Sequence, residues 1–383
     1  MNAYHKHFSD RWSIFCRVVD NYGDIGVCWR LARMLVRHHR KHVRIWLDAP
    51  QALTKILGRE ESEVGHRTIE GVEVLPWLPP FGSVSEDDVV IEAFSCDLPD
   101  DVLSAMTART PPPRWINLEY LSAEDWIEEC HGLPSPHPRL PLVRQFFFPG
   151  FTPATGGVLR EPDLLERRNR FRDSARAWLN RHTGCDISTD AWVISLFAYA
   201  QPDLTQLMRV WAASSRPVWL VVPAGRVVPD VARHFGLDTL TVGEHRSSDA
   251  LNVLILPFTD QDTYDRLLWA CDLNFVRGED SFMRAQWAGK PFVWQIYPQE
   301  EGTHLPKLEA FLSRYVNQLA DPSSHALREF WRAWNGVGDL AATWSAMAAS
   351  MPALAQHAEQ WGDTLAKQED LAGQLVSFSE SSV

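Results

Sequence analysis

Several features that would assign the chain to a membrane, secreted or nucleic-acid-binding class are missing from the sequence. No stretch approaches the ~18 consecutive apolar residues of a membrane-spanning helix. The first residues, MNAYHKHFSD, lack the long apolar region of a signal peptide. Basic residues are in deficit, with 37 Lys and Arg against 49 Asp and Glu and a formal charge of −12. Because gripping a nucleic-acid backbone needs a basic surface, we expect a cytoplasmic protein without membrane or direct nucleic-acid partners.

Common metal-binding and nucleophile motifs are also missing. The sequence has no HExxH, no GxSxG and no set of kinase motifs. Its cysteines form no CxxC pair, which favours buried free thiols over a zinc site or a disulfide framework; they are Cys16, Cys28, Cys96, Cys130, Cys185 and Cys271. We therefore expect no bound metal, no cofactor and a reaction that needs neither.

The 383 residues exceed what one hydrophobic core usually supports, so two domains are expected. Short apolar runs alternate with helical patterns, which is typical of an α/β protein. In the first half, the predicted elements are strands over residues 12–19, 43–47, 72–75, 89–92 and 115–118, a helix over 27–38 and a helix that starts between 122 and 127. Residues 131–155 are rich in proline and glycine, and we expect a linker there without long regular elements.

A second series of the same kind follows a polar helical stretch at 163–180. The predicted strands cover residues 192–197, 218–222, 253–256, 273–276 and 292–295, the helices between them cover 204–213, 228–235, 262–270 and 281–288, and helical patterns fill 305–376. In open α/β sheets, ligands bind at the carboxyl ends of strands, and they often bind between domains. The loops that follow strands in both halves are therefore the first places to search for a site.

The first such loop is DNYGDIG, where Asp20 and Asp24 flank a turn between a strand and a helix. The loop does not match the phosphate-binding pattern G-x-x-x-x-G-K-[ST], and two carboxylates would repel a diphosphate. They would suit a cationic or proton-releasing acceptor. The alternative is structural, with Asp24 capping the helix and Asp20 stabilising the turn.

A second loop, in VRGEDSFMRAQWAGKP, joins Arg277 to the helix that opens at Glu279, Asp280 and Ser281. Helix N-termini bind phosphate through unpaired N–H groups and the helix dipole, and Arg277 adds a forked cation. The alternative is a capping device, because acidic residues are favoured in a first helical turn. That alternative accounts for Asp280 but not for the Arg-Gly pair before it.

Aromatic residues follow two further strands of the second half. Phe258 and Gln261 lie in LPFTDQDTYDRLLWACD, and Phe197 and Tyr199 lie in LFAYAQPD. A ring and an amide side chain could recognise a pyrimidine by stacking and hydrogen bonding. The alternative is that these rings only fill the core or line a cleft.

Together, these segments resemble the elongation factor P arginine rhamnosyltransferase (EarP) family. The resemblance begins with IFCRVVDNYGDIGVCWRLARML and continues through SLFAYAQPD, the RGEDS segment and GTHLPKLEAF, covering most of the chain. It implies a GT-B-type α/β fold, in which two Rossmann-like domains face a central cleft. The N-terminal domain would cover residues 1–152 and hold the acceptor protein. The C-terminal domain would cover 153–359 and bind the nucleotide sugar, and residues 360–383 would cross back to the N-terminal domain.

The resemblance also implies an activity and roles for the residues. The chain would transfer L-rhamnose from dTDP-β-L-rhamnose to an arginine of elongation factor P, inverting and without metal. Asp20 and Asp24 would form the essential acidic pair, with Asp24 as the general base, and Glu279 would hold or activate the guanidinium. The donor-binding residues divide into those around the thymidine, Phe197, Tyr199, Phe258 and Gln261, and those facing the ribose, diphosphate and sugar, Arg277, Asp280, Ser281 and Tyr297.

Two other functions remain open at this point. One is a GT-B glycosyltransferase that acts on a saccharide, lipid or other small acceptor, although a basic, membrane-facing patch is not evident. The other is a binder of elongation factor P or of nucleotides without catalytic activity. The presence together of Asp20, Asp24, Arg277 and Glu279 disfavours a protein without activity.

Overall fold

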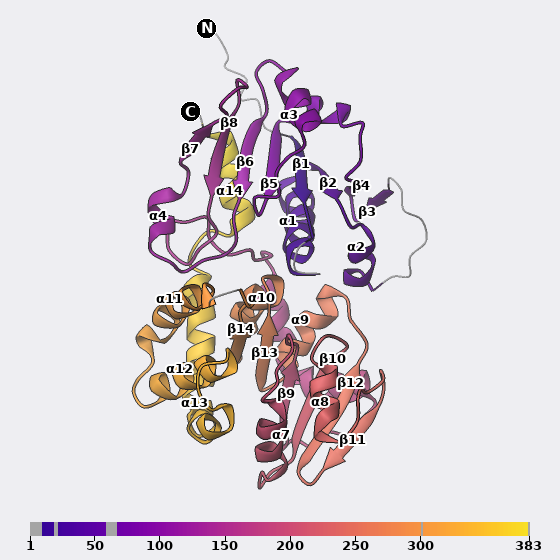
Figure 1. Cartoon of the computed structure of the whole chain (residues 1–383), viewed down its shortest axis with the longest axis vertical. Coiled ribbons are helices and arrows are strands. Elements are labelled where there is room, and N and C mark those ends of the chain that lie inside the picture. The colour runs from indigo at the N-terminus through magenta and orange to yellow at the C-terminus, as the bar shows by residue number, and fades with distance from the viewer. Residues whose placement is uncertain (1–9, 19–21, 59–66, 300–301, 382–383) are drawn as a thin grey trace. The chain divides into compact units, whose positions relative to one another are not determined.

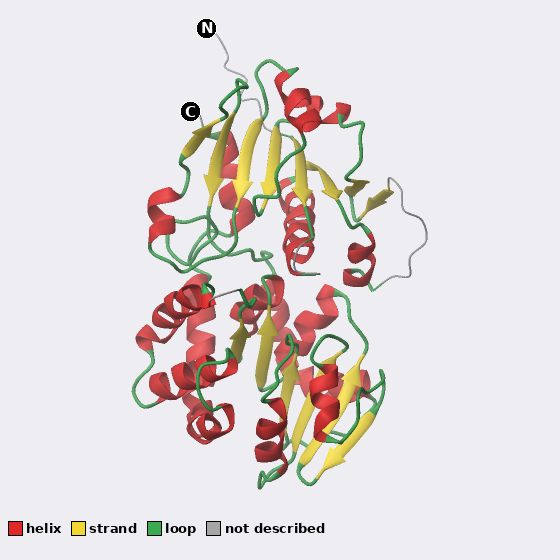
Figure 2. Cartoon of the chain, in the orientation of Figure 1, coloured by secondary structure: helices red, strands yellow, loops and turns green. Residues whose placement is uncertain are grey.

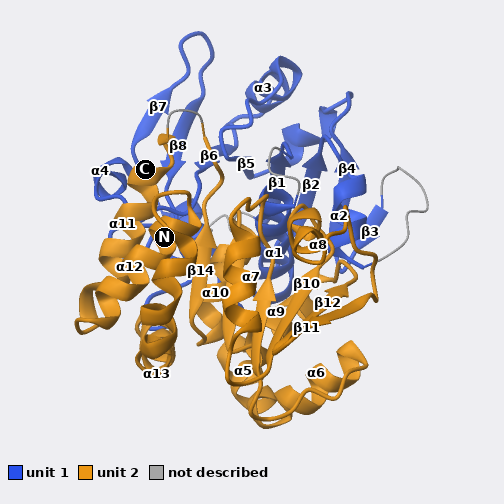
Figure 3. Ribbon diagram, turned by 60° about the horizontal axis from the view of Figure 1, so that its bottom comes forward, with its two compact units in different colours: residues 1–161, 366–383 blue, residues 162–365 orange. Residues whose placement is uncertain are grey.

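The structure is a computed structural model that describes residues 10–18, 22–58, 67–299 and 302–381. The chain divides into two units, coloured separately in Figure 3. Unit 1 comprises Met1–Glu161 and Ala366–Val383, and unit 2 comprises Pro162–Leu365. The expected α/β class is confirmed, because each unit is built on a largely parallel sheet with helices around it (Figures 1 and 2).

Unit 1 contains an eight-stranded sheet in the order β3-β4-β2-β1-β5-β6-β8-β7. Its strands are β1 Arg11–Cys16, β2 His42–Leu47, β3 Arg67–Ile69, β4 Val72–Pro76, β5 Val89–Ala93, β6 Arg114–Leu118, β7 Pro134–Pro136 and β8 Val143–Phe147. Its helices are α1 Gly23–His39, α2 Gln51–Ile56, the 3₁₀ turn η1 Gly82–Glu86, α3 Asp100–Thr107, α4 Trp126–Cys130 and α14 Leu371–Glu380. The two short strands at the ends of the sheet, β3 and β7, are antiparallel to their neighbours.

The central strands of unit 1 are buried on both faces. In β1, every residue from Trp12 to Cys16 is buried, as parallel sheets covered on two sides require. On one face, the Phe15 ring stacks on Trp46 with 5.4 Å between ring centroids, in a cluster that also contains Val102 of α3. The C-terminal helix α14 packs against α1. The end of the chain is therefore part of the fold of unit 1.

Unit 2 contains a six-stranded sheet in the order β11-β12-β10-β9-β13-β14. Its strands are β9 Trp192–Leu196, β10 Val218–Pro223, β11 His245–Ser248, β12 Leu251–Leu256, β13 Leu273–Arg277 and β14 Phe292–Gln295. Its helices are α5 Leu164–Phe171, η2 Arg172–Ser174, α6 Ala175–Thr183, α7 Leu204–Ala212, α8 Val228–His234, α9 Gln261–Ala270, α10 Asp280–Ala288, α11 Leu305–Tyr315, η4 Val316–Gln318, α12 Ser323–Trp334 and α13 Leu340–Leu365. All strand pairs are parallel except β11 with β12.

One region differs plainly from the sequence prediction. Residues 131–155 do not form an irregular linker, because Val143–Phe147 is strand β8, which pairs in parallel with β6. Pro134–Pro136 forms β7, which pairs antiparallel with β8 and closes that side of the sheet. Prolines are tolerated there because β7 is an edge strand. The sequence prediction missed this five-residue strand because proline and glycine residues lie on both sides of it.

Two other boundaries also differ. The first strand ends at Cys16, and α1 begins at Gly23 rather than at residue 27. The predicted helix at 163–180 consists of α5 and α6 separated by the 3₁₀ turn η2.

The prediction of free cysteines is confirmed, since all six are free thiols and four of them are buried. Within the part of the chain that the structure describes, no helix combines the length and apolarity that a membrane span requires.

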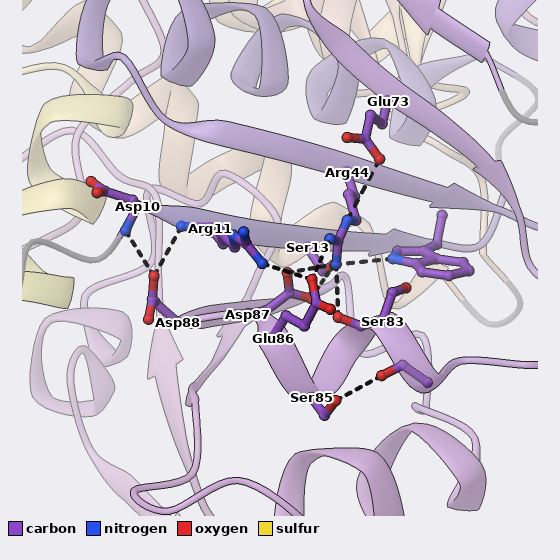
Figure 4. A network of polar contacts seen from close by, with 12 residues as sticks. Asp10, Arg11, Ser13, Arg44, Glu73, Ser83, Ser85, Glu86, Asp87 and Asp88 are labelled. Atoms are coloured by element: carbon purple, nitrogen blue, oxygen red, sulfur yellow. Dashed lines mark hydrogen bonds and ion pairs between the residues drawn. The ribbon is translucent and has the colours of Figure 1, made fainter.

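A polar network connects the amino ends of β1, β2 and β5 in unit 1 (Figure 4). Asp87, just before β5, is fully buried; it accepts a 2.5 Å hydrogen bond from Ser13 Oγ and lies 3.1 Å from Arg44 Nη1. Its neighbour Asp88 accepts a hydrogen bond from the backbone N–H of Arg11 at 3.0 Å. Burial raises the pKa of Asp87 from 3.8 to about 6, and the contacts with Ser13 and Arg44 only partly oppose this rise.

This raised pKa predicts how the stability of unit 1 depends on pH. Between pH 4 and 6, the folded chain keeps a proton on Asp87 that the unfolded chain has lost. The free energy of unfolding should therefore fall as pH rises through this window, by on the order of 3 kcal/mol, and level off above it. Urea denaturation should show Asp87→Asn gaining stability relative to wild type between pH 4 and pH 7.5. A difference that stays constant with pH would contradict the assignment.

Candidate active site

Each sheet has one point at which the strand order reverses, and Asp24 in unit 1 and Arg277 in unit 2 follow strands beside it. In unit 1, β1 lies between β2 and β5, so the chain leaves β1 towards one side and later returns to the other. In unit 2, β9 lies between β10 and β13 in the same way. Such switch points leave a crevice outside the carboxyl ends of the strands, where ligands of doubly wound folds bind.

In unit 1, Asp24 lies in the first turn of α1, directly after β1. It is only 1% exposed, and its Oδ1 accepts a hydrogen bond from Tyr120 Oη at 3.1 Å. The alternative that Asp24 caps the helix is wrong, because Tyr22 occupies the N-cap position. A carboxylate in a first turn also interacts favourably with the helix dipole. The other predicted acid, Asp20, lies outside the described residues.

The loop after β6 contacts this carboxylate through Tyr120, and the loop after β5 contacts Tyr120. Tyr120 follows β6, and the ring of Phe94, which follows β5, stacks on it with 4.3 Å between centroids and 12° between planes. Glu119 Oε1 accepts hydrogen bonds from Asn117 Nδ2 at 2.5 Å and from Ser95 Oγ at 3.0 Å. This edge of unit 1 therefore carries carboxylates and aromatic rings, which suit a cationic side chain.

In unit 2, Arg277 is the last residue of β13 and is 5% exposed. Its guanidinium carbon lies 4.6 Å from the ring centroid of Phe197 and 4.5 Å from that of Tyr199, both of which follow β9. The two rings hold the cation at the switch point. A buried arginine beside a helix N-terminus can stabilise a phosphate group.

The turn from β13 into α10 is braced by Ser281. Gly278 has a φ of 62°, the left-handed conformation that glycine adopts most easily. Ser281 Oγ accepts a hydrogen bond from Arg277 N at 3.0 Å and donates one to Arg277 O. Glu279 occupies the N-cap position of α10, is buried, and its side chain makes no capping hydrogen bond. The capping alternative therefore does not account for Glu279.

The remaining predicted donor residues extend from these groups. Phe258 meets Phe197 edge to face at 6.3 Å, and Tyr297, 42% exposed, meets Tyr199 edge to face at 5.5 Å. Gln261 Nε2 donates to Asp280 Oδ2 at 3.3 Å, which links the first turns of α9 and α10. The structure thus gathers the predicted residues of unit 2 at its strand ends, while their roles remain predictions.

Comparison with known proteins decides the family. The model of the EarP family, the elongation factor P (EF-P) rhamnosyltransferases, matches residues 12–380. The chain belongs to the EarP family. A protein-arginine rhamnosyltransferase of Pseudomonas putida is 50% identical, with 97% of this chain and 99% of that protein aligned. One of Pseudomonas aeruginosa is 49% identical over 96% and 98% of the two chains.

A solved structure of the family supports the same assignment. It is described as the structural basis for EarP-mediated arginine glycosylation of translation elongation factor EF-P. It superimposes with a TM-score of 0.70 at 38% identity and covers 97% of this chain and 99% of its own. The GT-B architecture expected from the resemblance, two Rossmann-like units in one chain, is the architecture of this EarP family member.

Several residues that hold the elements around these side chains were not singled out in the sequence. Asp265 of α9 and Arg284 of α10 form a buried ion pair with contacts of 2.6 and 3.0 Å, which fixes the two helices to each other. Gln295, at the end of β14, accepts a 2.7 Å hydrogen bond from Tyr199 N. Tyr120 and Phe94 were also missed. Asp265 and Arg284 lie in segments already examined, but no local spacing marks any of these residues, because the partner of each lies in another element.

We expected no pair of acidic residues with the DxD spacing of a metal site, and that expectation is wrong. Asp260 and Asp262 have the DxD spacing found in metal-dependent glycosyltransferases. Asp260, however, is the N-cap of α9, where its side chain accepts hydrogen bonds from Thr263 N at 2.9 Å and Thr263 Oγ1 at 2.7 Å. Among the described residues, no three His, Cys, Asp or Glu side chains are grouped as metal ligands would be.

Proposed function

We propose that the chain transfers L-rhamnose from dTDP-β-L-rhamnose to an arginine side chain of elongation factor P. The transfer inverts the anomeric configuration and needs no metal. The observation that carries the proposal is the separation of charge between the two switch points. Unit 1 presents the buried carboxylate of Asp24, and unit 2 presents the cation of Arg277 beside the start of α10. The names of the relatives, protein-arginine rhamnosyltransferases, support the same reaction.

Unit 2 is suited to the nucleotide-sugar donor. Phe197, Tyr199, Phe258 and Gln261 would surround the thymidine. Arg277, Asp280, Ser281 and Tyr297 would face the ribose, the diphosphate and the sugar. The Ser281 hydroxyl already bonds to both backbone groups of Arg277, so its larger contribution would be to hold the arginine turn in place.

Unit 1 is suited to the acceptor arginine. A guanidinium stays protonated up to about pH 12 and its lone pairs are delocalised, so it is a poor nucleophile until a base takes a proton. A carboxylate at the strand ends attracts the cation and orients it. Asp24 would serve as the general base, Asp20 would share the acceptor cation with it, and Glu279 of unit 2 would hold or activate the guanidinium.

The chemical step then involves one bond formed and one broken. A guanidinium nitrogen attacks the anomeric carbon, the C–N bond forms, and the proton from that nitrogen passes to the Asp24 carboxylate. The bond between the anomeric carbon and the diphosphate oxygen breaks, and dTDP leaves with the electron pair. Arg277 and the N–H groups at the start of α10 stabilise the growing negative charge on the leaving group. Because these donors can take the place of a metal ion, the proposal includes none.

The proposal places the reaction in the cytoplasm, where elongation factor P works in translation. It requires two partners, the nucleotide sugar and the acceptor protein, and it involves neither a membrane nor a direct contact with nucleic acid.

Intact-mass spectrometry tests the transfer itself. Elongation factor P incubated with this protein and dTDP-β-L-rhamnose should gain the mass of one deoxyhexose, and an acceptor with the target arginine replaced by lysine should gain none.

The same gain in mass is expected in EDTA, because Arg277 and α10 provide the stabilising charge. If the wild-type elongation factor P gains no mass, with or without EDTA, a saccharide or other small acceptor would be favoured. Loss of activity in EDTA, restored by magnesium or manganese, would contradict the metal-free step.

Donor binding should depend on Arg277. Replacing it with alanine removes a charge-assisted contact to the diphosphate, so dTDP should bind roughly ten- to hundredfold more weakly in calorimetry. The matched control is Arg170→Ala, which removes an exposed arginine of α5 paired with Glu166. It should leave the affinity unchanged. If wild type and a folded Arg277→Ala variant bind dTDP with equal affinity, Arg277 does not contact the diphosphate.

Turnover should depend on the carboxylate of Asp24. Asp24→Asn keeps the size of the side chain but removes the proton acceptor, so kcat should fall by roughly a hundredfold or more while donor affinity barely changes. Asp20→Asn should also reduce activity, with more of the loss in the KM for the acceptor. Asp100→Asn, at an exposed aspartate in the first turn of α3, is the control and should be silent. Near-wild-type turnover of a folded Asp24→Asn variant would contradict the assignment of Asp24 as the general base.

A further inference from the structure

Three separate strands contribute to the surroundings of Asp24. The aspartate follows β1, the Phe94 ring follows β5, and Tyr120 follows β6. Tyr120 Oη donates to Asp24 Oδ1 at 3.1 Å, and Phe94 stacks almost parallel on the tyrosine ring. The stack and the hydrogen bond together form a chain of contacts that ends on the carboxylate.

The backbone that presents Phe94 adopts an unusual conformation. Phe94 and Ser95 have φ values of 57° and 51°, a region that residues other than glycine seldom occupy. The turn is held by Glu92, whose buried carboxylate accepts the N–H of Asp97 at 3.0 Å and Trp115 Nε1 at 3.0 Å. Strained residues of this kind persist where the surrounding structure holds them, and they are found most often at functional sites.

We infer that Tyr120 is a positioning residue for Asp24, held in place by Phe94. The inference rests on the proposed function, in which Asp24 accepts the proton of the acceptor arginine. A hydroxyl that donates to one carboxylate oxygen fixes the plane of the carboxylate. It also stabilises the charged form, because hydrogen bonds to an ionised group favour that form. Tyr120 itself exchanges no proton with the substrate.

The test is Tyr120→Phe, which keeps the ring and its stack on Phe94 and removes only the hydroxyl. We expect kcat for rhamnosyl transfer to fall about tenfold, with the KM for the donor unchanged. Loss of the donated hydrogen bond should also make the Asp24 carboxylate less stable than its protonated form, so the acid limb of the pH–rate profile should move to higher pH. A purely structural role would not move that limb.

Two further variants isolate the hydroxyl. Tyr315→Phe removes the hydroxyl of a buried tyrosine in unit 2 and should change neither kcat nor the pH profile. Phe94→Leu weakens the stack but keeps the Tyr120 hydroxyl, so it should cost less activity than Tyr120→Phe and leave the acid limb in place. An equal loss in both variants without a shift of the limb would overturn the inference.

A double substitution and the wild-type reaction complete the test. If Tyr120 acts through Asp24, adding Tyr120→Phe to Asp24→Asn should cause no further loss of kcat, whereas additive losses would contradict the inference. Wild-type protein that adds no deoxyhexose to elongation factor P would overturn the proposed function and this inference together. Wild-type transfer with an unchanged profile in a folded Tyr120→Phe would overturn the positioning role alone.

Discussion

A parallel sheet places the carboxyl ends of its strands along one edge, and this constraint organises both halves of the molecule. Where the strand order reverses, beside β1 in unit 1 and beside β9 in unit 2, the following loops diverge and leave room for a ligand. Residues distant in the sequence meet there. Asp24 and Tyr120 are 96 positions apart, yet share a hydrogen bond. The chain uses the same topological feature twice, with different side chains at each.

A buried arginine lies at the switch point of unit 2, and a buried aspartate lies at that of unit 1. In unit 2, Arg277 is held between Phe197 and Tyr199, which gives an acidic chain a local cation. In unit 1, the groups that meet are the carboxylate of Asp24 and the hydroxyl of Tyr120. A diphosphate and a guanidinium have opposite charges, so Arg277 would attract the diphosphate and Asp24 would attract the guanidinium.

The sequence predicted correctly those elements whose local residue pattern matches their final structure. The alternation of strands and helices, the free cysteines and the turn that carries Arg277 were all predictable from spacing. The prediction failed where tertiary pairing outweighs local signals, as in β8, which turn residues surround on both sides. It also failed at the start of α1, because apolar periodicity begins only after Asp24. Tyr120 was missed because its importance lies in a contact with a distant strand, which no local spacing records.

The division of substrates between the two units is the central claim, and hydrogen–deuterium exchange measures it most directly. With dTDP alone, the backbone amides of residues 196–199 and 277–281 should be protected, and those of residues 22–26 and 118–122 should exchange as in the free protein. With elongation factor P alone, the amides of residues 22–26 and 118–122 should be protected, and those of residues 196–199 should exchange as in the free protein. Protection of residues 22–26 by dTDP, with none at residues 277–281, would contradict the account.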